Sequence, residues 1–153
     1  MPQSPIRVLF VCHGNICRST MAEFVLKDMV ARRGLAEQFR IESAATSTEE
    51  IGNPVHPAAV LREHGIGGFE GKRARQLRRA DYDAFDFIIG MDTANIRNMN
   101  WILGGDPDGK VLKLLEFAGT NRSVDDPWYT GDFETTYADV CDGCEGLLAY
   151  LGV

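Results

Sequence analysis

The sequence IRVLFV at residues 6–11 runs directly into CHGNICRS at residues 12–19, and these two segments decide the fold. The first is rich in β-branched and aromatic residues with little alternation, which is typical of a parallel strand covered on both faces. Gly14 and Asn15 then interrupt the pattern, and apolar residues at helical spacing follow as far as Gly34. The order strand, tight loop, helix places function just after the first strand.

The rest of the chain repeats this alternation. Further strands are predicted over 39–44, at an edge of the sheet, and over 85–91 and 111–115. Helices are predicted over 19–33, 57–64, 92–103 and 133–151. Alternating strands and helices favour right-handed crossovers. We therefore expect an α/β fold, in which residues 1–153 form a single domain with a four-stranded parallel sheet and helices on both faces, a Rossmann-like three-layer sandwich.

The composition is that of an ordinary globular protein. Of the 153 residues, 44% are hydrophobic and 25% are charged, which gives no reason to expect disorder or a coiled coil. The 16 basic and 22 acidic side chains leave a net charge of −6, so we expect binding to neither nucleic acid nor a membrane surface. The apolar runs are too short to span a bilayer, and the first residues show no signal-peptide pattern. A cytoplasmic location is predicted.

The loop after the first strand has the residues of an anion-binding, nucleophilic site. Cys12 and Arg18 are six positions apart with a Gly-Asn turn between them. If the loop curls, its backbone N–H groups, the end of the helix and the guanidinium surround a tetrahedral oxyanion. These positive surroundings favour thiolate over thiol, so Cys12 is expected to attack a bound phosphomonoester and form a cysteinyl phosphate. Ser19 is placed to donate a hydrogen bond to the sulfur, and the chemistry requires no metal or other cofactor.

A proton donor for the leaving group is predicted in the segment Asp125-Asp126-Pro127-Trp128-Tyr129. Pro127 should hold an extended loop and keep Asp126 out of a helix. A carboxyl group beside two aromatic rings can stay protonated, act as general acid and then serve as base toward water. Asp125 is the rival candidate, and a capped turn is the simpler interpretation.

These motifs resemble those of the low-molecular-weight protein tyrosine phosphatases, nearly from end to end. The pattern V-C-x-G-N-I-C-R-S of that family is matched by residues 11–19, and its Asp-Pro acid is matched by residues 126–129. The resemblance implies a phosphotyrosine phosphatase I-like fold and an enzyme that hydrolyses phosphotyrosine in proteins or peptides, as a monomer or weak homodimer. Its catalytic residues would be Cys12, Arg18 and Asp126.

The resemblance also implies the other residues of the site. The substrate would be bound by His13, Gly14, Asn15, Ile16, Cys17, Ser19, Trp128 and Tyr129, with the two aromatic side chains forming the walls of a slot for the substrate ring. Asn15 and Ser43 would brace the loop through hydrogen bonds. His13 should point outward at the rim, and the bulk of Ile16 favours phosphotyrosine over phosphoarginine, because related protein-arginine phosphatases tend to have threonine there.

Some positions depart from the family. Thr20 replaces a proline at the start of the helix, with little expected effect. Lys72 stands where many members have a histidine that supports the loop, which leaves the rigidity of the loop in question. Glu49 and Glu50 lie in a segment that borders the mouth of the site and would disfavour acidic phosphopeptides. A basic cluster, Lys72, Arg73, Arg75, Arg78 and Arg79, would attract such peptides, and the sequence does not decide between the two effects.

Other functions are possible for the same motifs. An arsenate reductase would relay oxidation through two cysteines near the middle of the chain, and none lies between Cys17 and Cys141. A non-catalytic phosphotyrosine-binding module would be expected to lose the nucleophile or the acid, and a redox sensor has no use for Asp126. Cys17 could be a core residue or a disulfide partner of Cys12. Cys141 and Cys144 lie on an apolar helical stripe and are expected to pack in the core.

Overall fold

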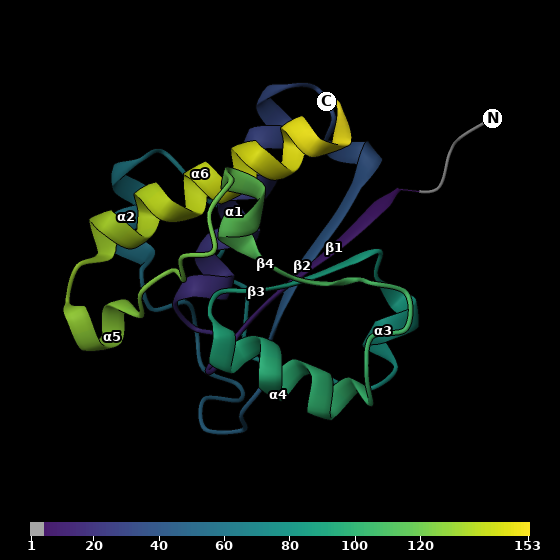
Figure 1. Cartoon of the computed structure of the whole chain (residues 1–153). Helices are drawn as coiled ribbons and strands as arrows, with labels where there is room; N and C mark the ends of the chain where they lie inside the picture. The colour runs from purple at the N-terminus through teal and green to yellow at the C-terminus, as the bar shows by residue number, and fades with distance from the viewer. Residues whose placement is uncertain (1–4) are drawn as a thin grey trace.

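The strand β1 (Ile6–Cys12) occupies the middle of the sheet in the computed structural model, which describes residues 5–153 (Figure 1). The strand order is β2-β1-β3-β4, with β2 (Phe39–Ala45) and β4 (Val111–Lys113) at the edges and β3 (Phe87–Gly90) inside. Each strand is parallel to its neighbours. The predicted four-stranded parallel sheet is confirmed. Residues 1–4, which belong to the segment predicted to have no signal-peptide pattern, lie outside the described range.

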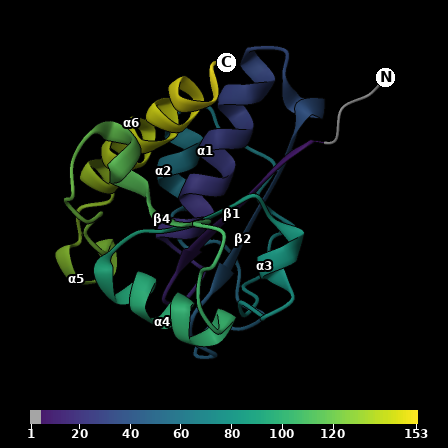
Figure 2. The same cartoon turned by 45° about the vertical axis from the view of Figure 1, so that its right-hand side comes forward.

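Successive residues of β1 enter two different cores. Val8 and Phe10 pack in the core that includes α1 (Arg18–Arg32), α2 (Ala58–Glu63) and α6 (Phe133–Leu151). Leu9 and Val11 pack in the core on the other face, against α3 (Asp81–Ala84) and α4 (Thr93–Leu103). Figure 2 shows these two helical layers on either side of the sheet. All four side chains are fully buried, so the strand can offer functional groups only where it ends.

The expected elements are present, with two local differences. Residues 114 and 115 are not strand, because the chain turns after β4 into the 3-10 helix η2 (Leu114–Ala118), whose first two side chains are buried. Asp126 is extended, as expected, but Pro127 begins the short helix α5 (Pro127–Thr130) instead of continuing an extended loop. Proline suits the first helical position, where its missing N–H has no intrahelical partner to lose. The short 3-10 helix η1 (Ala36–Gln38) and α3 were not predicted.

The cysteines of α6 are part of the core. Cys144 is fully buried, and Cys141 is partly buried against the same core. Within residues 5–153, no three His, Cys, Asp or Glu side chains are grouped as metal ligands would be. The same residues contain no helix with the length and apolarity needed to cross a membrane. Core packing, as predicted, accounts for the Cys141 and Cys144 pair.

Two glycines let α6 approach η2 closely. A Cβ atom at Gly143 would overlap the side chain of Leu114, and one at Gly146 would overlap the backbone carbonyl of Phe117. The backbone carbonyl cannot move aside as a flexible side chain end can. The approach fixes α6 against the segment that follows β4, and thereby the chain that leads toward Asp126.

We expect Gly146→Ala to destabilise the fold although alanine favours helix. Overpacking at this contact should cost about 1–3 kcal/mol, more than the gain of about 1 kcal/mol in helix propensity. Urea denaturation measures the change. The control is Gly67→Ala, where nothing lies within 4 Å of the added Cβ. Equal stability of the two variants would show that the close approach is not rigid.

Candidate active site

The anion loop, residues 12–18, connects the end of β1 to the start of α1. Asn15 adopts a left-handed backbone conformation with φ 57°, the one positive φ among the described residues other than glycine. Asparagine tolerates this conformation better than most side chains do. The reversal at Asn15 directs its backbone N–H to the Cys12 Sγ atom, 3.3 Å away. The loop thus folds back over its own first residue.

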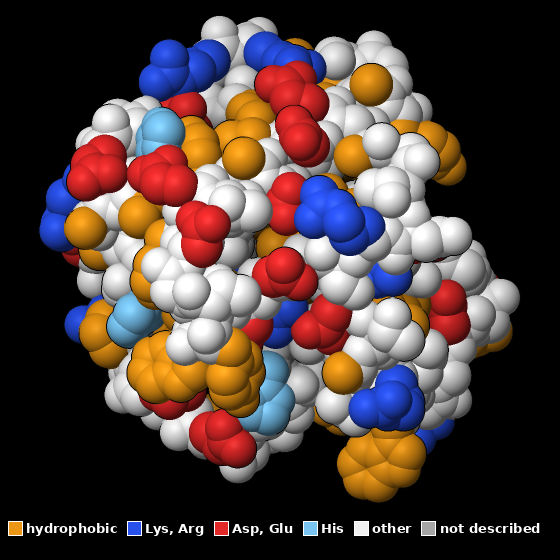
Figure 3. Space-filling model, turned by 60° about the vertical axis from the view of Figure 1, so that its left-hand side comes forward, with side chains coloured by type: hydrophobic (Ala, Val, Ile, Leu, Met, Phe, Trp, Pro, Cys, Tyr) orange, Lys and Arg blue, Asp and Glu red, His pale blue; other side chains and the backbone are white. Residues whose placement is uncertain are grey.

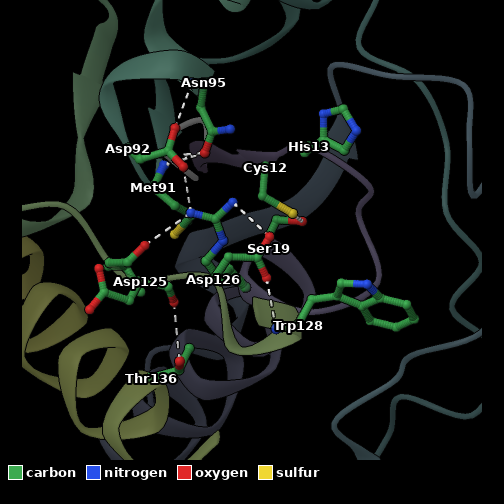
Figure 4. Close-up of polar contacts among 12 residues, drawn as sticks. Cys12, His13, Ser19, Met91, Asp92, Asn95, Asp125, Asp126, Trp128 and Thr136 are labelled. Atoms are coloured by element: carbon green, nitrogen blue, oxygen red, sulfur yellow. Dashed lines mark hydrogen bonds and ion pairs between the residues drawn. The ribbon is translucent and has the colours of Figure 1, made fainter. Parts of the chain in front are cut away.

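The Asn15 side chain fixes the direction of a hydrogen bond to the sulfur. Its Oδ1 accepts a hydrogen bond from the backbone N–H of Arg75 at 3.1 Å, so its Nδ2 must face Ser19. Nδ2 donates to the Ser19 Oγ at 2.8 Å. That oxygen lies 3.0 Å from the Cys12 Sγ (Figure 4). Because Ser19 already accepts from Asn15, its own proton is free to point to the sulfur. The sulfur thus has two hydrogen-bond donors directed at it.

The start of α1 adds positive charge to the loop. The helix begins at Arg18 with no side-chain cap and no acidic residue in its first turn. Thr20 donates its hydroxyl to the Cys17 carbonyl at 2.9 Å and so is accommodated where the family usually has proline. The positive end of a 15-residue helix therefore faces the loop without compensation from its own first turn.

The guanidinium of Arg18 is almost fully buried and is held by acceptors from distant segments. Its Nη1 donates to the Asp92 Oδ2 at 2.7 Å and to the Val124 carbonyl at 2.9 Å. Its Nη2 lies 3.6 Å from the Asp126 Oδ2. Burial lowers the pKa of Arg18, but the negative charges of Cys12, Asp92 and Asp126 raise it by more, so the net shift is upward. Arg18 is a permanent cation beside the sulfur.

The structure brings Asp126 to this cation and leaves Asp125 outside. The Asp126 side chain is 26% exposed, and its Oδ1 accepts a hydrogen bond from the Trp128 N–H at 3.0 Å, which caps α5. Asp125 is exposed, and its carboxylate points away from the Cys12 sulfur (Figure 4). Its carbonyl accepts a hydrogen bond from Thr136. Only one of the two predicted acids therefore borders the anion loop.

A pocket opens over the loop. Its lining includes most of the residues predicted for the site, together with two glutamates: Cys12, His13, Gly14, Ile16, Cys17, Arg18, Glu49, Glu50, Asp126, Trp128 and Tyr129. Two further predicted residues, Asn15 and Ser19, are fully buried behind it. Figure 3 views the molecule from the side of α5, where acidic side chains are scattered over the surface and hydrophobic side chains form a patch beside a histidine.

The mouth of the pocket carries acidic groups. The His13 ring lies at the rim, half exposed, with its Nε2 2.9 Å from the Glu49 Oε2. Glu50 covers the loop from the same side, since a Cβ atom at Gly14 would meet its Cγ at 3.3 Å. Glu49 and Glu50 are both pocket residues. The pocket is therefore cationic at its base and acidic at its entrance.

The basic cluster lies elsewhere. None of its five residues lines the pocket, and its two less exposed members are paired with carboxylates. Arg75 contacts Asp81 at 3.1 Å, and Lys72 lies 3.6 Å from Glu23. The structure thus places Glu49 and Glu50, and not the cluster, at the substrate entrance.

Ser43 and Lys72 belong to a network behind the loop. The Ser43 hydroxyl donates a short hydrogen bond to the Glu23 Oε1, so its partner is on α1 and not in the loop. The Lys72 Nζ donates to the Ser43 carbonyl at 2.8 Å. Burial lowers the pKa of Lys72, and Glu23 partly offsets that effect. Asn15 braces the loop directly, whereas the Ser43 side chain, expected to do the same, makes its hydrogen bond to Glu23 of α1 instead of to the loop.

Cys17 is a buried thiol. Burial, followed by the negative charge of Cys12, raises the pKa of Cys17 to about 12. Its side chain packs in a small apolar cluster with Ile16 and Ala74. All four cysteines are free in the structure, so a disulfide between Cys12 and Cys17 stays a prediction.

Asp92 was given no role from the sequence, but in the structure it accepts a hydrogen bond from Arg18. Asp92 also caps α4, since its Oδ1 accepts from the Asn95 N–H at 2.7 Å. A signal was present: an aspartate follows β3 at the same sheet edge as Cys12 and begins a helix. What the sequence could not show is that its second oxygen reaches Arg18.

We expect Asp92→Asn to weaken phosphate binding. The single amide oxygen can still cap α4, but the amide nitrogen then faces Arg18, and two donors cannot bond. Loss of this hydrogen bond to a charged group should weaken the binding of inorganic phosphate by about tenfold, as measured by calorimetry. Asp125→Asn removes the same charge nearby and is the control. Tighter binding in Asp92→Asn would show that Asp92 only neutralises the guanidinium.

Comparisons with known proteins agree with this geometry. Residues 7–152 match the family model described as low molecular weight phosphotyrosine protein phosphatase. The low molecular weight protein-tyrosine-phosphatase YfkJ of Bacillus subtilis is 42% identical over 148 residues, which are 94% of each chain. The human low molecular weight phosphotyrosine protein phosphatase is 37% identical over 153 residues, covering 95% of this chain and 96% of its own.

Solved structures give the same result. The crystal structure of YfkJ matches with a TM-score of 0.93 at 40% identity, over 99% of this chain and 98% of that chain. The Drosophila arginine phosphatase DARP matches with a TM-score of 0.85 at 28% identity, over 97% of this chain and 99% of its own. The family match extends through the anion loop and the Asp126 segment. The chain belongs to the low molecular weight phosphotyrosine protein phosphatase family.

Proposed function

We propose that this protein-tyrosine-phosphatase acts through Cys12 as nucleophile, Arg18 as phosphate ligand and Asp126 as acid and then base. The observation that carries the proposal is the convergence of these three side chains in one pocket, although Asp126 is far from the other two in sequence. Their functional groups differ as the chemistry requires: a sulfur with two donors, a fixed cation and a carboxyl.

In the first step the Cys12 thiolate forms a bond to phosphorus while the bond from phosphorus to the tyrosine oxygen breaks. Asp126 gives its proton to that leaving oxygen. In the second step Asp126 takes a proton from water, whose oxygen attacks the cysteinyl phosphate and releases phosphate and the thiolate. Ser19 and the Asn15 N–H stabilise the departing sulfur.

Arg18 is suited to bind two phosphate oxygens at once. Its two hydrogen bonds to described residues, to Asp92 and Val124, both use Nη1. Nε and Nη2 then remain as a planar fork toward the phosphate. Because a buried guanidinium held in this way has little freedom to lose on binding, its orientation is set before substrate arrives.

Phosphotyrosine fits the walls of the pocket. Trp128 and Tyr129 are largely exposed and line the pocket together. Ile16 contributes an apolar surface to the same pocket. These three side chains would contact the substrate ring, and the anion loop its phosphate.

We further propose that the chain acts as one domain, in the cytoplasm, as a monomer or weak homodimer. Both helical layers pack on the same strand, β1, so neither core is complete without the sheet. Four free cysteines suit a reducing compartment.

Aryl phosphates with leaving groups of different acidity test the mechanism, in the presence of a metal chelator. Cys12→Ser should abolish hydrolysis. Asp126→Ala should slow phenyl phosphate by about a hundredfold or more, and 4-nitrophenyl phosphate much less, because nitrophenolate leaves without a proton.

The matched control is Asp125→Ala, which should retain near-native rates on both substrates. Activity that survives Cys12→Ser would refute the nucleophile. A leaving-group effect in Asp125→Ala, and not in Asp126→Ala, would reverse the assignment of the acid.

The acidic mouth should disfavour phosphopeptides with acidic residues beside phosphotyrosine. We expect Glu49→Gln with Glu50→Gln to lower KM for such a peptide by about two- to fivefold at low salt, a size typical of exposed charge pairs. KM for a peptide with neutral flanks should change less. Glu63→Gln with Glu70→Gln, at exposed positions outside the pocket, removes equal charge and is the control. Equal effects of both double variants would contradict a local role.

A further inference from the structure

We propose that His56 is a positioning residue that holds the Trp128 indole at the wall of the pocket. The proposal rests on the proposed function, in which this indole contacts the substrate ring. His56 does not itself line the pocket, so it would act through Trp128.

The His56 ring contacts two other aromatic rings. Its centroid is 5.2 Å from that of Trp128, with an interplanar angle of 62°. It is also stacked on Phe133, at 5.5 Å and 27°. Both arrangements are favourable for aromatic pairs. The contacts run from Phe133 through His56 to Trp128 in the pocket wall, and we call this series of three rings the column.

The main chain fixes the position of His56. Its backbone N–H donates to the Ile16 carbonyl at 2.8 Å, which ties it directly to the anion loop. Pro57 follows it, and a residue before proline is restricted to extended backbone. Pro54, two residues earlier, pairs with Arg73 in an isolated bridge. The histidine ring therefore has a defined place relative to the phosphate site.

The other end of the column is also anchored to the loop. Phe133 is the first residue of α6 and packs on the buried cluster of Ile16, Cys17 and Ala74. Two residues of that cluster belong to the anion loop. Through His56 and Phe133 the distance between the phosphate site and the indole is set by packing as well as by the backbone of α5.

Trp128 has few other restraints. Its side chain is 58% exposed, and its helix α5 has only four residues. Its hydrogen bond to Asp126 is made by the backbone N–H and leaves the indole free to rotate about its side-chain bonds. Without His56 the indole would leave the wall for part of the time, and substrate binding would have to restore it.

The test uses a protein in which Trp128 is the only tryptophan. The chain has two tryptophans, and Trp101 is 85% exposed, so Trp101→Phe provides this background. In it, His56→Ala should raise KM for an aryl phosphate by about two- to tenfold, as expected for one aromatic pair, with kcat near its original value. The inhibition constant of inorganic phosphate should not change, because phosphate does not contact the indole.

Two further variants separate positioning from folding. His56→Phe keeps an aromatic ring in the column and should restore KM. His64→Ala removes a histidine that stacks on Tyr137 at 3.8 Å, outside the pocket, and should leave KM unchanged. Trp128 fluorescence gives an independent readout: acrylamide quenching should rise and anisotropy should fall in His56→Ala, and both should recover in His56→Phe.

Three outcomes would overturn the proposal. KM and Trp128 fluorescence could both be unchanged in His56→Ala, His56→Phe could behave like His56→Ala, or phosphate inhibition could weaken as much as KM rises. The last would mean that His56 supports the loop as a whole. Failure of the Trp101→Phe protein itself to hydrolyse an aryl phosphate would instead contradict the proposed function.

Discussion

A buried cation is the constraint on which the site depends. A guanidinium removed from water needs acceptors close by, since an unpaired buried charge is strongly destabilising. Arg18 finds them at Asp92, at the Val124 carbonyl and, at longer range, at Asp126. These groups follow β3 and precede α5, so the fold must bring the sheet edge and the α5 segment together before Arg18 is satisfied. The acceptors that Arg18 needs therefore hold the segment of Asp126 next to the loop of Cys12.

The opposite charges of the site are separated by depth. The cation is at the base, with the sulfur and the end of α1, whereas Glu49 and Glu50 stand at the entrance. A doubly charged phosphate is repelled by Glu49 and Glu50 at the entrance. It is attracted by Arg18 and the backbone N–H groups only when it reaches the loop. This arrangement favours a phosphate carried on a side chain long enough to reach the base while its peptide stays outside.

The elements that could be predicted are those determined by residues adjacent in sequence. Adjacent residues encode the strand at residues 6–11, the loop after it and the helix beyond. The resemblance to the phosphatase family added the assignment of Asp126 as the acid. The contacts of Asp92 and His56 were not predictable, because each joins segments far apart in sequence through geometry that no periodicity records. Local turn chemistry explains the smaller errors: Pro127 starts α5, and the chain leaves β4 at Leu114 to pack under α6.

The hydrogen bond that holds the Asn15 side chain determines which substitutions this protein can tolerate near the loop. The group that holds the Asn15 amide is the main-chain N–H of residue 75, and every amino acid except proline supplies one. The side chain at position 75 can therefore be substituted, and its contact with Asp81 lost, while the backbone N–H still supports the reversal of the loop at Asn15. Mutations at residue 75 can therefore change the side chains near the nucleophile without removing the backbone N–H that holds Asn15.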